Sequence, residues 1–340
     1  MPERRGLYTI TLSNQPTILG RAAVVGKKEG EGPLGKEFDA VFEDTRLGEK
    51  TWEKAESALQ KEALTRALDR AGLSPSQLQY LFAGDLLNQN IASTFGLRDM
   101  NVPLIGQFGA CSTMGQTIAM AAIFVDSGAA DLCAAVTSSH FCTAERQFRY
   151  PLEYGGQRPP TSQWTATAAG AVIVGRAGKG VRIAEVTIGR VQDLGVTDAN
   201  NMGSAMAPAA ADTLERFFTD TGTRPEDYTQ IVTGDLGQVG SDLCRELMAK
   251  KGFPLGDNYT DCGLLLFDRQ TQDVHAGGSG CGCSASVLCG HFLPMLERGE
   301  LPELLFCPTG ALMSPTSSQQ GESIPGICHA LLLTGDKPQQ

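Results

Sequence analysis

Apolar residues recur along the chain in two similar series of segments. The first series opens over residues 51–73 with a helical pattern and continues, after a glycine and a proline-containing link, into QYLFAGDLLNQ (79–89). The second series repeats this order with AAADTLERFFTDTG (209–222), TRPEDYTQ (223–230) and QIVTGDLGQVG (230–240). In the first helix the apolar residues at helical spacing are Trp52, Ala55, Leu59, Ala63, Leu64, Ala67 and Leu68. Each series therefore predicts a helix that is followed by a buried strand ending in Gly-Asp-Leu.

A second matching unit follows each of these strands. GACSTMGQTIAMAAIFVDSGAAD (109–131) and GCGCSASVLCGHFLPMLERGELPE (280–303) both pass from a turn of small residues into an apolar helix. Both helices are expected to end at a glycine, and the strands LCAAVTSS (132–139) and ELLFCPTG (303–310) follow them. The repetition predicts an α/β protein of two similar halves, residues 1–178 and 179–340, with sheets covered by helices. The alternative is that the two series resemble each other by chance, because the same helix-ending glycines and turns are common in α/β proteins.

The loops after the predicted strands are the candidate ligand sites. Ligands of such folds bind at the carboxyl ends of strands, beside the N-termini of helices. Four loops qualify: 85–90, 107–115, 235–241 and 277–284. The long segment 138–165, placed within the first half, has the length and composition of a lid or a pocket wall. The charged residues of helix 50–73, namely Lys54, Glu56, Lys61 and Arg70, are expected to form a solvated face.

Composition excludes several classes of function. The 340 residues carry a formal net charge of -10, which argues against a nucleic-acid binder, although a local basic pocket can still bind an anion. We expect no signal peptide and no membrane span, because the N-terminal segment lacks a sustained apolar core and no apolar stretch is long enough. Membrane association would then depend on partners. The ten cysteines are expected to be free thiols, mostly buried.

Cys111 is the candidate nucleophile. It lies at the first turn of a predicted helix, where the helix N-terminus lowers a thiol pKa and also attracts anions. A thiol nucleophile needs a base within hydrogen-bond reach. The chain has four histidines, His140, His275, His291 and His329.

The segment HAGGSGCGCSASVLCGH (275–291) contains two histidines and three cysteines, residue types that bind zinc. Its cysteines follow a C-x-C spacing, and Cys289 and His291 fall on different faces of a predicted helix. A glycine-rich turn with buried thiols explains the segment better, and no Lys-Ser/Thr follows GGSGCG as in a phosphate-binding loop. We therefore expect no metal site, no cofactor and no nucleotide.

Several motifs together resemble a known family. GACSTMGQ, the two Gly-Asp strands and GGSGCGCSASV resemble the thiolase superfamily, including 3-oxoacyl-(acyl-carrier-protein) synthase III. FGACSTMGQ, SSHFCTAERQFRYP, GQRPPTSQWTATAAGAVIVG and TDCGLLLFD resemble the stage V sporulation protein AD family over residues 5–335. The resemblance implies a thiolase-like fold with α-β-α-β-α layers, and a homodimer. It also implies binding of dipicolinic acid (pyridine-2,6-dicarboxylate) and its uptake into the developing spore, with a possible part in germination. The protein would act beside other proteins of a channel, peripheral at the spore inner membrane.

The resemblance also assigns positions. Cys111 matches the superfamily nucleophile, and Cys283 matches the second cysteine that thiolases use as acid and base. At the two positions where the superfamily places histidine partners of the nucleophile, this chain has no histidine. One loop carries Asp235 and Gln238, and the other position falls on or near Ser279. An aspartate beside Cys111 would disfavour the thiolate. We therefore expect a binding protein without catalysis.

A planar dianion requires N–H donors, cationic groups and flat apolar walls. The N-terminus of the helix at Cys111 is expected to meet one carboxylate. The other expected ligand-binding residues are Asn88, Gln89, His140, Arg146, Arg149, Gln238, Ser279 and Cys283, with Tyr150 or Trp164 stacking on the ring. Asp235 would orient a donor or hold the calcium that accompanies dipicolinate.

Two other hypotheses remain open. The chain could be an acyl-thioester transferase in which Cys111 is the nucleophile and Cys283 the base. It could also be a scaffold in which the pocket has no function and the surface binds partners. Binding of dipicolinate and acylation of Cys111 separate the three.

Overall fold

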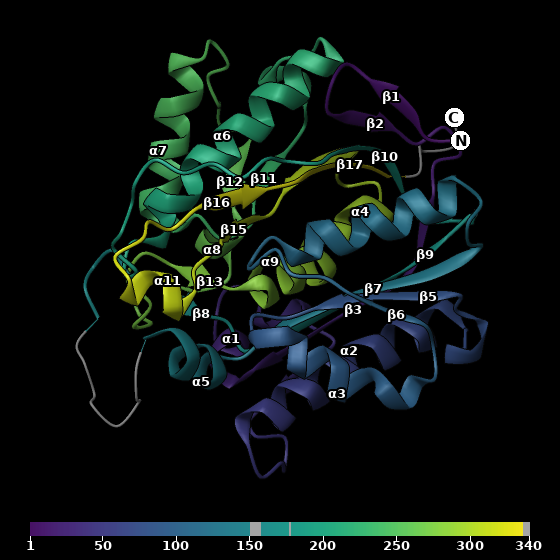
Figure 1. The fold of residues 1–340 in the computed structure, drawn as a ribbon. Coiled ribbons are helices and arrows are strands. Elements are labelled where there is room, and N and C mark those ends of the chain that lie inside the picture. The colour runs from purple at the N-terminus through teal and green to yellow at the C-terminus, as the bar shows by residue number, and fades with distance from the viewer. Residues whose placement is uncertain (150–157, 177, 336–340) are drawn as a thin grey trace.

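The computed structural model of the protein describes residues 1–149, 158–176 and 178–335, and its helices and strands form layers (Figure 1). Helices α2 (Trp52–Ala71) and α3 (Ile91–Leu97) form one outer layer, and α6 (Met202–Thr221) and α7 (Gly237–Lys250) form the other. Helix α4 (Thr113–Asp126) lies in the middle with α9 (Cys281–Val287). The sheet strands separate the middle layer from each outer layer, which gives the expected α-β-α-β-α arrangement.

The first half of the chain builds five strands of the main sheet. Their spatial order is β3 (Thr17–Gly26), β9 (Ala168–Gly175), β7 (Leu132–Ser139), β5 (Tyr80–Gly84) and β6 (Leu104–Gly106). Strand β9 is antiparallel to both β3 and β7, whereas β7, β5 and β6 are parallel to one another.

The second half repeats this order. Its strands are β10 (Val181–Thr187), β17 (Ala330–Thr334), β14 (Glu303–Cys307), β11 (Ile231–Thr233) and β12 (Tyr259–Asp261). Strand β17 is antiparallel to both of its neighbours, and β14, β11 and β12 are parallel. The prediction of two similar halves is therefore confirmed. Strands β10 and β3 pair through Val181 with Ile18 and join the halves into one sheet, while the boundary at 178/179 stays a prediction.

The helices end at the glycines that the sequence predicted. Gly72 and Gly222 adopt left-handed conformations, with φ of 68° and 71°, after α2 and α6. Gly128 and Gly299 do the same beyond the two central helices, with φ of 79° and 71°. The second central helix is interrupted, because α9 passes through a π-helical turn (Leu288–Phe292) before it continues as α10 (Leu293–Glu297).

Two expectations about the helices were wrong. Helix α6 begins at Met202 rather than Ala209 and contains Pro208; Asn201 caps it by accepting a hydrogen bond from Ser204 N at 3.3 Å. The small residues on either side of Pro208 are buried, and this packing outweighs the lost backbone hydrogen bond. Glu56 does not belong to a solvated face, because it is fully buried on the sheet side of α2.

The shorter elements complete the chain. Strands β1 (Glu3–Arg5), β2 (Thr9–Thr11) and β4 (Ala40–Phe42) extend the main sheet, and α1 (Lys27–Gly30) follows β3. The 138–165 segment contains the end of β7, α5 (Phe141–Ala144), a π-helical turn (Glu145–Arg149) and β8 (Trp164–Thr165), which pairs with β13 (Gly278–Ser279). The remaining elements are α8 (Cys262–Leu265), β15 (Thr309–Ala311), α11 (Pro315–Gln319) and β16 (Gly326–Cys328). None of the helices in the described residues is long and apolar enough to cross a membrane.

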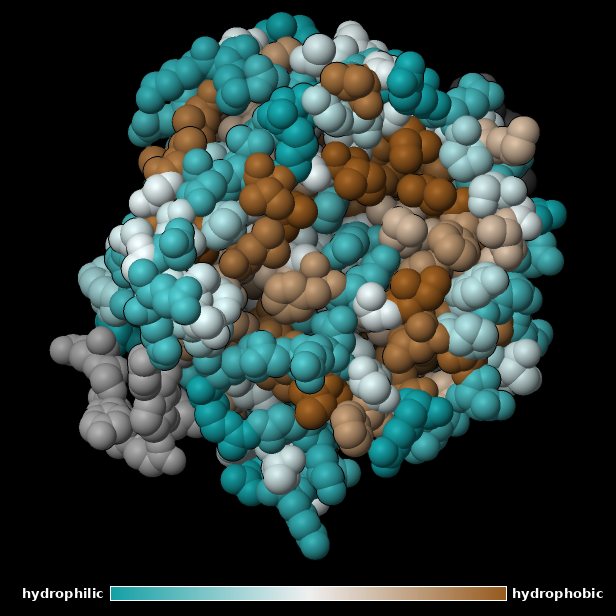
Figure 2. All heavy atoms as spheres, viewed as in Figure 1, coloured by the Kyte–Doolittle hydropathy of each residue, from teal (hydrophilic) through white to brown (hydrophobic). Residues whose placement is uncertain are grey.

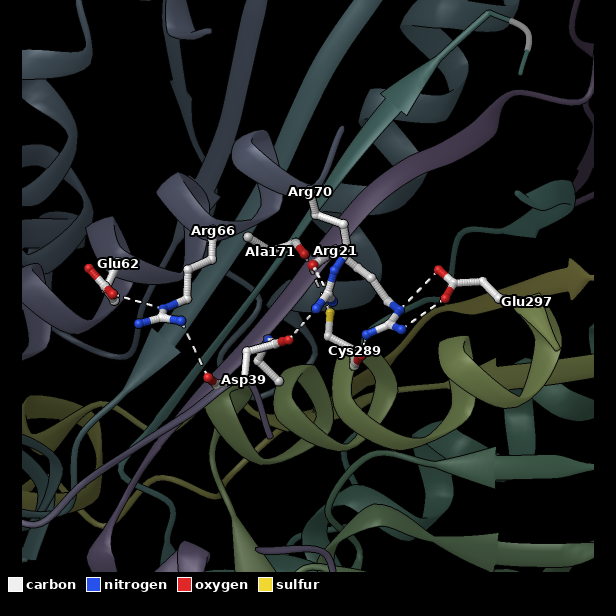
Figure 3. Close-up of polar contacts among 9 residues, drawn as sticks. Arg21, Asp39, Glu62, Arg66, Arg70, Ala171, Cys289 and Glu297 are labelled. Atoms are coloured by element: carbon white, nitrogen blue, oxygen red, sulfur yellow. Dashed lines mark hydrogen bonds and ion pairs between the residues drawn. The ribbon is translucent and has the colours of Figure 1, made fainter. Parts of the chain in front are cut away.

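Arg21 of strand β3 and Arg70 of the outer helix α2 belong to a polar network that reaches α10 of the second half (Figure 3). Arg21 pairs with Glu297 at 2.8 Å and donates to the carbonyl oxygen of Cys289 at 3.0 Å. Arg70 pairs with Asp39, whose other oxygen accepts a hydrogen bond from Ala23 N at 2.8 Å. Isolated surface ion pairs contribute little, but a network of this kind fixes the relative position of the elements it joins.

Candidate functional site

Cys111 lies in a tight turn between β6 and α4. The preceding residue, Ala110, has φ of 49°, a conformation that residues with a side chain rarely adopt. The turn is held by Ser112, which donates to Gly109 O at 2.7 Å, and by Thr113, which donates to Ala110 O at 2.6 Å. This backbone fixes the thiol at the start of α4, as the sequence predicted.

A small cavity lies against the thiol. It is lined by Leu86, Phe108, Ala110, Cys111, Ala144, Phe148, Thr165, Met202, Ser279, Ala311 and Met313. Both halves of the chain and the 138–165 segment contribute to it. Its volume of about 30 Å³ is room for one or two water molecules. Of the described residues that line it, none is positively charged.

A buried carboxylate lies behind the cavity wall. Asp235 is fully buried at the end of β11 and accepts hydrogen bonds from Ser279 Oγ at 3.2 Å, Gly280 N at 2.9 Å and Thr309 Oγ1 at 2.9 Å. Burial raises the pKa of Asp235 to about 6, although these donors oppose the shift, so the group is ionised at neutral pH. Cys111 Sγ lies 4.0 Å from Ser279 Oγ, and Ser279 in turn donates to this carboxylate.

The surroundings of Cys111 oppose a thiolate. Burial raises the pKa of Cys111 well above its ordinary value, and the negative charge of Asp235 raises it further. The helix N-terminus does not outweigh these two effects. Both effects disfavour the thiolate, in the direction that the sequence predicts for an aspartate at this position.

None of the four histidines, all of which the structure describes, lines the cavity. His140 is buried elsewhere: its Nε2 bonds to Thr45 O at 2.9 Å, its Nδ1 accepts from Cys142 N, and its ring packs on Trp52. His275 and His291 pair with Asp273 and Glu37. Burial lowers the pKa of His329 to about 4. No imidazole is thus placed to take the proton of Cys111.

The structure separates the expected ligand-binding residues into two groups. Asp235 and Ser279 lie at Cys111, and Cys283 is buried nearby with its Sγ 3.9 Å from Gly234 O, but it does not line the cavity. Asn88, Gln89 and Arg146 instead line a separate polar cleft, where Arg146 forms an ion pair with Glu53.

Gln238 and Trp164 lie outside both groups. Gln238 bonds to Asp242 on its own helix at 2.8 Å. Trp164 is covered on its ring by Phe141, which stacks at 3.7 Å, and by Lys28, whose Nζ lies 3.4 Å from the ring centroid. Arg149 ends the π-helical turn, but its side chain lies outside what the structure describes, and Tyr150 lies outside the described residues.

Sequence reasoning missed the apolar lining of the cavity. Phe148, Met202 and Met313 come from three distant segments, and no local pattern marks them as neighbours. Phe148 stands among charged residues in ERQFR, and this contrast was the one available signal.

A second buried acidic pair lies under the first-half strands. Asp85, which ends β5, accepts hydrogen bonds from Leu87 N at 2.9 Å and from Ser93 N at 2.8 Å. Glu56 accepts from Thr143 Oγ1 at 2.6 Å and from Ser138 Oγ at 3.2 Å. Burial, followed by the charge of Asp85, raises the pKa of Glu56 to about 8. Across the described part of the chain, no group of three or more His, Cys, Asp or Glu side chains could hold a metal ion.

Comparison with known proteins identifies the family. A model of stage V sporulation protein AD matches residues 6–334. Stage V sporulation protein AD of Bacillus subtilis (strain 168) is 46% identical over 327 residues, covering 96% of each chain. The chain belongs to the stage V sporulation protein AD family. The expected role in sporulation, stated at the level of the family, is thereby confirmed.

Solved structures place this sporulation family in the thiolase-like fold. The 3-oxoacyl-(acyl-carrier-protein) synthase III of Aquifex aeolicus VF5 aligns over 94% of this chain and 99% of its own, with a TM-score of 0.56 and 15% identity. OleA of Xanthomonas campestris, a variant crystallised with cerulenin, aligns over 94% and 96%, with a TM-score of 0.58 and 14% identity. At these identities the similarity shows the fold and not the activity.

Proposed function

We propose that the protein binds dipicolinic acid without chemical conversion and supports its uptake into the spore. The observation that carries this proposal is the retained turn at Cys111 without a base: the thiol faces a buried carboxylate, and no histidine lines the cavity. Thiol catalysis requires an activated thiolate. A chain that has the turn and the cavity but opposes the thiolate is better suited to binding at this site than to thiol catalysis.

An outer chamber next to the cavity suits the carboxylates of the ligand. It is lined by Arg146, Gln147, Phe148, Thr197, Ala199, Met313, Pro315, Ser318 and Gln319, with a volume of about 590 Å³. Phe148 and Met313 line both spaces. In the face drawn in Figure 2, apolar side chains also reach the surface between the two outer layers of helices.

The charges favour one orientation of the ligand. Asp235 repels an anion from the inner cavity, whereas Arg146 offers a guanidinium group to a carboxylate in the outer chamber. We place the pyridine ring against Phe148 and Met313 and a carboxylate beside Arg146. Since the described residues hold no metal cluster of their own, calcium would enter with the ligand and be bound largely by its carboxylates.

Calorimetric titration with dipicolinate tests the proposal. We expect one site per chain with a dissociation constant below about 1 mM. Arg146→Ala should weaken binding about tenfold through the lost charged hydrogen bond, and Cys111→Ser should change it less than about threefold, because the thiol is only part of a wall. Arg98→Ala, which removes an exposed arginine that lines a different surface pocket, is the matched control.

Three outcomes would contradict the proposal. They are the absence of saturable heat, equal binding of benzene-1,3-dicarboxylate, which lacks the ring nitrogen, and loss of binding in Cys111→Ser. Repeating the titration with calcium present shows whether the metal accompanies the ligand.

The family also suggests the assembly and the location of the protein. We propose a homodimer that works beside the other proteins of the spore membrane channel, peripheral at the inner membrane. Strand β6 is an edge strand of the main sheet, and edge strands can pair with another chain. Three large apolar side chains on or near this strand in the sequence are exposed: Phe95, Leu104 and Phe108. Light scattering on the purified protein checks the dimer; a monomer at all accessible concentrations would contradict it.

Acyl transfer remains the second candidate, because the turn at Cys111 is the feature that an acyltransferase of this fold would use. It requires a thiolate that Asp235 opposes.

A further inference from the structure

The inner cavity and the outer chamber share two lining side chains, one aromatic ring and one methionine. Phe148 and Met313 line both spaces. The inner cavity, at about 30 Å³, is too small for a ring-bearing ligand, whereas the outer chamber is many times larger. Phe148 and Met313 are therefore the side chains that a molecule passing from the outer chamber to Cys111 would meet.

Phe148 is carried by an unusual backbone. It lies in the π-helical turn Glu145–Arg149, which directly continues α5. Single π-helical turns are rare, and they occur often at functional positions. The extra residue in the turn changes the direction of the side chains that follow it, and here it brings Phe148 to the cavity.

The neighbouring side chain fixes this turn to the loop after β5. Gln147 Nε2 donates to Leu86 O at 3.1 Å, and Gln147 Oε1 accepts from Asn88 N at 3.1 Å. Leu86 itself lines the inner cavity. On the other side, Arg146 pairs with Glu53 of α2. The turn is thus attached on both sides by polar contacts that are partly exposed to solvent.

The loop that receives Gln147 is itself strained. Gln89 and Asn90 follow one another with φ of 62° and 52°. Each such conformation costs on the order of 1 kcal/mol, and strain of this kind persists where surrounding contacts impose it. The strained loop places Leu86 O and Asn88 N where one glutamine can bond to both.

We propose that Phe148 determines the access to the Cys111 cavity and its size selectivity, and that Gln147 is the positioning residue that holds Phe148 in place. When the two Gln147 hydrogen bonds open, the turn moves as a unit and connects the chambers. This inference goes beyond the proposed function and does not depend on which ligand the protein binds.

Labelling of Cys111 with thiol reagents of two sizes tests the inference. Methyl methanethiosulfonate is the small reagent and N-(1-pyrenyl)maleimide the bulky one, both applied at pH 9 to the full-length protein. For each protein that is labelled, a matching variant that also carries Cys111→Ser gives the background labelling of the other cysteines. We expect Phe148→Ala to increase the rate of Cys111 labelling by the bulky reagent about tenfold, and the rate with the small reagent much less. Gln147→Ala should increase both labelling rates about threefold, because local opening controls access to a buried group.

Two further variants control for misfolding and for access to the cavity from another side. Phe148→Leu should give an intermediate rate and protects against misfolding of the alanine variant, which circular dichroism monitors. Phe108→Ala opens the cavity on a different side, because Phe108 also lines it and is 46% exposed. Unchanged labelling in Phe148→Ala and Phe148→Leu, or acceleration only in Phe108→Ala, would overturn the inference.

Discussion

Replacing Asp235 with asparagine is expected to make Cys111 react about tenfold faster with iodoacetamide at pH 8, because removal of the adjacent negative charge lowers the thiol pKa. Burial is the larger cause of the raised pKa of Cys111, so the thiol of the variant still titrates above its ordinary range. Asparagine fits the site: its oxygen can accept from Gly280 N and Ser279 Oγ, and its amide can donate to Thr309 Oγ1.

The labelling rate is measured by mass spectrometry of the Cys111 peptide, with Cys142, which is partly exposed, as the internal reference. Acceleration of both cysteines would indicate general loosening of the structure. An unchanged rate at Cys111 in a folded variant would contradict the electrostatic role of Asp235.

Glu56→Gln is expected to stabilise the protein increasingly as the pH rises. The folded pKa of Glu56 is about 8, above its ordinary value of 4.5, so the folded state retains a proton that the unfolded state releases. The unfolding free energy contributed by Glu56 therefore falls as the pH rises from 4.5 to about 8. Glutamine does not ionise, and we expect its advantage over the wild type to be roughly 3 to 4 kcal/mol larger at pH 8 than at pH 5.

Urea unfolding at the two pH values measures this difference. Glu62→Gln on the same helix is the matched control for loss of a carboxylate, because Glu62 is partly exposed and pairs with Arg66. A stability difference between Glu56→Gln and the wild type that does not change with pH would show that Glu56 is ionised in the folded protein.

Periodicity predicted most of the fold because the two halves repeat the same local signals. The order of helix, glycine, proline-containing link and strand is visible in both copies, and left-handed Gly72 and Gly222 end α2 and α6 as expected. The start of α6 was missed because Pro208 reads locally as a helix boundary. Only the burial of residues on both sides of it explains why the helix continues.

The site was predicted less completely, and the reason is physical. Cys111 and Ser279 come just before the two central helices α4 and α9, and Asp235 follows β11, so all three lie in the loops that the sequence marked as candidate ligand sites. His140 was expected to contact a ligand because of its residue type, but its ring nitrogens bond to the backbone and its ring packs on Trp52. Glu56 has the helical spacing of the buried stripe, four residues after Trp52 and three before Leu59, and it was expected at the surface only because its side chain is charged. Contacts between distant segments, such as that of Phe148 with Met313, leave no local signal.

The proposal that Cys111 is not catalytic is tested most directly by the intact mass of the protein after incubation with acetyl-coenzyme A and with an acyl-carrier-protein thioester. Because Asp235 and burial keep the thiol protonated, we predict an unchanged mass at neutral pH over a period in which a thiolase-fold acyltransferase would be fully acylated. A single acyl group that appears on the wild type and is absent from Cys111→Ser would contradict this and identify the protein as an enzyme.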